Sequence, residues 1–167
     1  MNLIQKHSTK TEFAPSEHVQ KGEPRMRLFL DTEFNEFQGP LISMALFPEH
    51  RSILPFYESL GCENPGPWVA EHVMPFIGKE AISLADFQIY LHHFLSQWDE
   101  VTIVADWHED IAHFCGVLTT GPGERINTPS LNFQIRRDLD TIPSLIPHNA
   151  LSDAEAMLRS AEVNAKR

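Results

Sequence analysis

The amino-acid sequence predicts an α/β fold in which helices pack on a mixed central β-sheet. Three short apolar segments follow one another closely near the N-terminal end, two later apolar segments have the length of strands, and amphipathic helical patterns lie between and after these. The 167 residues are 42% hydrophobic, which is enough for one core of ordinary size. We therefore expect a flexible leader over 1–25 and a single domain over 26–167.

The segments 26–30, 41–47 and 51–57 are expected to form an antiparallel three-stranded meander, because only short turn-forming stretches separate them. Pro55 should confine the third strand to an edge or a bulge, since proline cannot donate to a hydrogen-bond ladder. A short helix should begin near Pro67, because proline suits the first helical turn.

Stronger helical signals follow this first part of the domain. Ser83 can cap a helix over 83–98, with Asp86 three residues later in the capping-box position. The β-branched run 101–105 predicts a central strand, and the apolar spacing over 109–118 predicts the next helix.

The last part of the chain predicts a loop over 119–130 by composition and a weaker strand over 131–135. A final helix is expected to follow, capped by Ser152 with Glu155 three residues later. Strands and helices thus alternate in this half, as expected for helices packed on a sheet.

Composition narrows the class of protein. The formal net charge of −10 argues against a protein that binds nucleic acid through a broad basic face, although an enzyme can still reach phosphate through metal ions. Two cysteines are too few for a disulfide framework. The sequence has neither a membrane-spanning apolar run nor a signal-peptide pattern, so we expect a cytoplasmic protein with no membrane partner.

Two acidic residues, Asp31 and Glu33, directly follow the first apolar segment. Side chains two residues apart in an extended chain project from the same face, where two like charges repel unless a cation lies between them. A strand that simply ends in a polar turn would show the same residues, so this pair alone does not establish a metal site.

Further acids and a histidine favour the metal site. Asp106 follows the strand over 101–105, Asp110 lies in the first turn of the next helix, and His148 and Asp153 lie near the start of the last helix. Carboxylate oxygens suit Mg²⁺ or Mn²⁺, and two such ions about 3.5–4 Å apart stabilise both the attacking and the leaving oxygen in phosphodiester hydrolysis. The imidazole can accept a proton from the attacking water near neutral pH.

These motifs resemble those of the DEDDh (DnaQ-like) 3′–5′ exonuclease superfamily, whose members have an RNase H-like fold. The segment FLDTEF resembles the first motif and HNALSDA the third, with histidine five residues before aspartate, while DWHEDIAHFCGVL fits the second motif more loosely. The resemblance covers about residues 26–161. Together with LISMALF and WVAEHVMPFI, it is closest to the small bacterial exoribonucleases of the mycobacterial, RNase T-like type.

The resemblance implies an enzyme that digests RNA from its 3′ end. It also implies two divalent cations, Mg²⁺ or Mn²⁺, four acidic ligands and a histidine as general base: Asp31, Glu33, Asp110, Asp153 and His148. Asp106 stands where relatives often have a neutral residue, so either Asp106 or Asp110 can be the second-motif ligand. We favour Asp110, because a helix N-terminus stabilises a carboxylate.

Three more residues are candidates for binding the substrate. Phe34 and Trp107 lie beside the predicted acids and can stack on a base, and Arg136, which adjoins Arg137, can hold a backbone phosphate. Ordinary packing and charge balance would explain the same residues.

The expected partner is the 3′ end of RNA, with single-stranded DNA as the alternative. Metal and phosphate chemistry are the same for both, so a DNA-directed exonuclease of the proofreading type stays open, as does a catalytically silent nucleic-acid-binding module. The resemblance also allows a homodimer, although no segment of the sequence indicates an interface.

Overall fold

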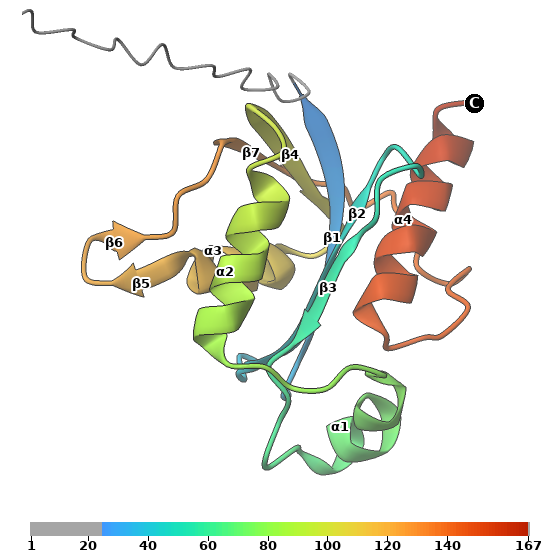
Figure 1. The fold of residues 1–167 in the computed structure, drawn as a ribbon. Helices are drawn as coiled ribbons and strands as arrows, with labels where there is room; N and C mark the ends of the chain where they lie inside the picture. The colour runs from blue at the N-terminus through green and yellow to red at the C-terminus, as the bar shows by residue number, and fades with distance from the viewer. Residues whose placement is uncertain (1–24, 167) are drawn as a thin grey trace, which may run out of the picture.

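A five-stranded mixed sheet forms the centre of the structure (Figure 1). The computed structural model describes residues 25–166, and the predicted leader over 1–25 lies outside them apart from Arg25. The strands are β1 (Met26–Phe34), β2 (Leu41–Pro48), β3 (Phe56–Ser59), β4 (Glu100–Ala105) and β7 (Ser130–Ile135), in the spatial order β3-β2-β1-β4-β7. β2 runs antiparallel to β1 and β3, whereas β4 is parallel to both β1 and β7.

Helices cover both faces of this sheet, so the predicted α/β class is confirmed. The helical elements are α1 (Pro67–His72), the short 3-10 helix η1 (Met74–Phe76), α2 (Leu84–Leu95), α3 (His108–Leu118) and α4 (Ala150–Asn164). In Figure 1, α4 lies on one side of the sheet and α2 and α3 lie on the other. No helix within residues 25–166 has both the length and the apolar character that a membrane span requires.

The side chains of β1 alternate between two cores. Leu28 and Leu30 are fully buried in the core that α2 and α3 cover, whereas Phe29 is buried in the core that α4 covers. Because successive side chains of a strand point to opposite faces, Asp31 and Glu33 follow Phe29 onto the α4 side, and Thr32 follows Leu30 onto the α3 side. This alternation distributes the polar end of β1 between the two layers of helices.

Two predicted helix starts are confirmed. α1 begins at Pro67, and α2 begins after Ser83, whose side chain accepts a hydrogen bond from the backbone N–H of Asp86. α2 ends at Leu95, earlier than the predicted end at residue 98.

Two predicted boundaries in the non-helical segments were wrong. β3 begins at Phe56, directly after Pro55, and residues 51–53 turn rather than extend, so the proline lies just outside an edge strand. The predicted loop over 119–130 contains a small hairpin, β5 (Thr119–Gly121) and β6 (Glu124–Arg125). Its turn includes Gly123 at a φ of 74°, a conformation that glycine adopts without strain.

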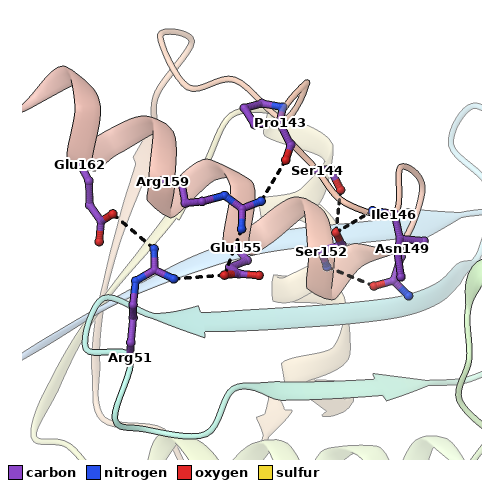
Figure 2. Close-up of polar contacts among 9 residues, drawn as sticks. All are labelled: Arg51, Pro143, Ser144, Ile146, Asn149, Ser152, Glu155, Arg159 and Glu162. Carbon is purple, nitrogen blue, oxygen red and sulfur yellow. Dashed lines mark hydrogen bonds and ion pairs between the residues drawn. The ribbon is translucent and has the colours of Figure 1, made fainter.

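The predicted cap of the last helix was also wrong. α4 begins at Ala150, and the Asn149 side chain accepts the hydrogen bond from the backbone N–H of Ser152 at 3.1 Å (Figure 2). The Ser152 hydroxyl instead accepts hydrogen bonds from the Ser144 hydroxyl and from the backbone N–H of Ile146. Ser152 therefore stabilises the loop before the helix, while Asn149 caps the helix itself.

Glu155, predicted to complete a capping box, takes part in an ion-pair network along α4 (Figure 2). Arg51, from the turn between β2 and β3, pairs with Glu155 at 3.1 Å and with Glu162 at 3.3 Å. Arg159 pairs with Glu155 and also donates a hydrogen bond to the Pro143 carbonyl. Exposed pairs of this kind contribute little stability singly, but this set links α4 to the loop before it and to the sheet.

Replacing Asn149 with alanine should destabilise the fold by about 2–3 kcal/mol, through loss of the helix cap and of the hydrogen bonds that its amide donates to the Tyr57 hydroxyl and the Phe76 carbonyl. The matched variant Ser152→Ala retains the cap and should cost about 1 kcal/mol. Urea denaturation of the two variants measures the difference. A larger cost for Ser152→Ala would mean that the serine is the stronger determinant of the helix start.

Candidate metal centre

Three acids from β1 and α4 meet on one face of the sheet. Asp31 and Glu33 lie on the α4 side of β1, as its alternation dictates, and Asp153 lies in the first turn of α4. One carboxylate oxygen of each lies within 4.8 Å of the other two. On α4, Asp153 belongs to the same buried stripe as Ala150 and Met157, so the helix face that packs on the sheet also presents the carboxylate.

A second group of acids shares Asp31 with the first. Asp106 directly follows β4, and Asp110 lies in the first turn of α3 with only 4% of its surface exposed. One oxygen of each lies within 4.8 Å of the other and of Asp31. The parallel neighbours β1 and β4 end at the same edge of the sheet, which brings their following residues together.

The Thr32 hydroxyl donates a buried hydrogen bond of 2.6 Å to a carboxylate oxygen of Asp110. Thr32 points to the α3 side of β1, so β1 contributes residues to both acidic groups from its two faces. Asp106 and Asp110 both lie beside Asp31, and the hydrogen bond from Thr32 fixes the orientation of Asp110.

Burial and mutual repulsion raise the proton affinity of the cluster. Burial, followed by the neighbouring carboxylates, raises the pKa of Asp31 well above its usual range and the pKa of Glu33 to about 8. Burial likewise raises the pKa of Asp110 to about 7, although the Thr32 hydroxyl opposes the shift. Burial is also the main cause of the raised pKa values of Asp106 and Asp153.

The donor set fits a hard divalent cation. Asp153 Oδ2 accepts a hydrogen bond of 3.1 Å from the backbone N–H of His148, whereas Asp153 Oδ1 is buried and has no hydrogen-bond partner among residues 25–166. An unpartnered carboxylate oxygen among like charges is costly to bury unless a cation compensates it. Oxygen ligands alone are the preference of Mg²⁺, Mn²⁺ and Ca²⁺, so these acids could hold metal ions.

His148 lies at the α4 end of the cluster. Its backbone has a φ of 62°, in the left-handed region that costs a non-glycine residue about 1 kcal/mol or more, and its N–H bond to Asp153 helps to hold it there. Its imidazole packs edge-on against Trp68, with ring centres 5.0 Å apart. The base predicted from the sequence thus lies beside a predicted ligand.

Trp68 is a site residue that the sequence analysis missed. It is 52% exposed, and its indole stacks on the His72 ring at 4.8 Å while contacting His148. The helical spacing around Trp68 could have indicated its exposure. Val69 and Val73 form the buried stripe of α1, and Trp68 lies outside that stripe. A tryptophan outside the apolar stripe of its helix suggests a role at the surface.

The three residues predicted to contact the substrate have different surroundings in the structure. Phe34 follows a register shift at which β2 has one extra residue, Ile42, and its ring packs on His113 at 4.7 Å and is half-buried. Trp107 is 41% exposed next to Asp106. Arg136 is bound by Asp138 and lines a separate pocket that contains none of the clustered acids.

Neither a scan against models of known protein families nor a search of curated proteins finds a match to this chain. Its chemistry is therefore inferred from the site itself.

Without metal, the stability that the cluster contributes should fall as pH rises from about 4.5 to about 8, the interval set by Glu33. The folded state keeps protons that the unfolded chain has already released, so raising the pH favours unfolding. Thermal melts in chelator over this pH interval measure the decline in stability. In melts with Mn²⁺ in place of the chelator, the stability should depend less on pH. In Asp31→Asn the decline should be shallower, because one charge is gone. Equal slopes for the two proteins in chelator would contradict the repulsion described here.

Proposed function

We propose that this chain is a metal-dependent 3′–5′ exoribonuclease of the DEDDh type that releases nucleoside monophosphates. The observation that carries the proposal is the convergence of five carboxylates from four segments of the chain, Asp31 being common to both groups, with His148 bonded through its main chain to one of them. The mixed sheet and its helices are compatible with the RNase H-like fold that the sequence motifs imply.

The two acidic groups suggest that each would bind one of two metal ions with a different role. When bound, two Mg²⁺ or Mn²⁺ ions would activate the attacking water and stabilise the leaving 3′-oxygen. Asp31, common to both groups, would hold both ions, with Glu33 and Asp153 completing one site and Asp110 supporting the other. The assignment of His148 as base marks the Glu33 and Asp153 side as the side of attack.

His148 accepts the proton of the attacking water on one of its ring nitrogens. Its main chain is fixed by Asp153 and its ring contacts Trp68, so the base is held from two directions. In-line displacement puts the leaving oxygen opposite the attacking water, on the side of Asp106 and Asp110.

Incubation of the purified protein with 5′-labelled RNA and DNA, single-stranded or with a 3′ overhang, tests the proposal directly. We expect a ladder that shortens from the 3′ end of RNA only when Mg²⁺ or Mn²⁺ is present. Asp31→Asn should abolish it because both sites lose their common ligand, and His148→Ala should slow it about 10²- to 10⁴-fold. Both variants should remain folded by circular dichroism.

Three results would count against this function: no ladder from the folded wild-type protein, a ladder independent of metal, or full activity of Asp31→Asn. Faster digestion of DNA than of RNA would reject the exoribonuclease in favour of the DNA-directed enzyme.

A paired comparison tests the second-motif ligand. Asp110→Asn should abolish activity, because Thr32 orients Asp110 toward the cluster, whereas Asp106→Asn should retain measurable turnover. Rates with Mn²⁺ at saturating RNA measure both. Loss of activity only in Asp106→Asn would reverse the assignment.

A further inference from the structure

Trp107 and Arg137 form an exposed pair at one end of the acidic cluster. The Arg137 guanidinium lies 4.5 Å from the centre of the Trp107 ring, and its Nη1 donates a hydrogen bond of 3.2 Å to the Asp106 carbonyl. Trp107 is 41% exposed and Arg137 is also exposed. The pair therefore presents an aromatic surface and a positive charge beside one of the clustered acids.

The adjacent residues Arg136 and Arg137 have different hydrogen-bond partners. Arg136 makes two hydrogen bonds to the Asp138 carboxylate, which neutralises its charge. Among residues 25–166, no carboxylate forms an ion pair with Arg137, whose one side-chain hydrogen bond there goes to a main-chain oxygen. The charge of Arg137 opposes the rise in the pKa of Asp106, but without an ion pair its guanidinium remains available to an anion, although the chain as a whole carries a net charge of −10.

The location of Trp107 and Arg137 determines which nucleotide of a substrate they can contact. Asp106 and Asp110 belong to the acidic group that does not contain Asp153, the residue bonded to His148, and the proposed function assigns the leaving oxygen to that group. In 3′–5′ hydrolysis the leaving 3′-oxygen belongs to the penultimate nucleotide. The other exposed tryptophan, Trp68, lies with His148 on the side of the terminal nucleotide.

Resting on that function, we propose that Trp107 and Arg137 form the subsite for the penultimate nucleotide. The base stacks on the part of the Trp107 ring that Arg137 and His108 leave exposed, and its phosphate pairs with Arg137. Aromatic faces accept any base, and a planar guanidinium suits phosphate oxygens. This subsite binds only substrates that extend beyond the scissile bond, so a released monophosphate does not touch it. It favours oligonucleotides over product.

Matched arginine variants test the subsite by binding. Fluorescence anisotropy with a labelled hexanucleotide RNA, in Ca²⁺ to suppress cleavage, should show about tenfold weaker affinity for Arg137→Gln and for Trp107→Ala. The slope of log affinity against log salt should fall by about 0.7 in Arg137→Gln, as for loss of one phosphate contact. Arg136→Gln removes the same charge from the neighbouring residue and should stay within about twofold of wild type.

Inhibition by adenosine 5′-monophosphate shows whether Trp107 and Arg137 bind RNA directly or only support the structure of the acidic cluster. Arg137→Gln and Trp107→Ala should leave its inhibition constant unchanged, whereas a distorted acidic cluster would alter it. Equal RNA affinity of Arg136→Gln and Arg137→Gln would overturn the subsite, as would parallel losses of monophosphate and RNA affinity. The failure of the proposed function looks different: wild-type protein would then neither cleave RNA nor bind it in Ca²⁺.

Discussion

Repulsion among the carboxylates around Asp31 is the constraint on which the rest of the site depends. Each acid lies in or next to an element whose other residues are anchored in a core: Asp31 follows Phe29 and Leu30 in β1, and Asp153 shares its stripe with the alanines of α4. Core burial supplies the free energy that holds like charges together, because a single buried leucine or phenylalanine contributes about 1.5–3 kcal/mol. The cluster is therefore a strained feature on a well-packed frame, and a cation relieves that strain.

Much of this frame could be predicted from the sequence because its signals are local. Ser83 capped its helix as expected, and the β-branched run near residue 103 formed a central strand. The start of α4 could not be predicted in the same way, because Asn149 and Ser152 are both good capping residues. The choice depends on the Tyr57 hydroxyl and the Phe76 carbonyl, which are distant in sequence and meet Asn149 only in the fold.

In the candidate site, too, some features could be predicted from local sequence and others depend on contacts between distant residues. The acids could be identified because carboxylates directly after apolar strands, and near the starts of the following helices, form a pattern in the sequence, and the structure brings all of them together. The choice between Arg136 and Arg137 could not be made from sequence, since the two are neighbours of identical type. Pairing with Asp138 occupies one, and the approach of the other to Trp107 depends on the ends of β4 and β7 lying side by side.

The hydrogen bond between the His148 main chain and Asp153 has a consequence for how the centre can vary. It joins a residue that would move protons to a residue that would bind a cation, so neither can shift without displacing the other. Residues coupled in this way show strongly non-additive effects when both are changed. In evolutionary terms the dependence is one-sided: loss of the Asp153 carboxylate frees the His148 main chain, whereas a substitution at 148 other than proline keeps the N–H that donates this bond.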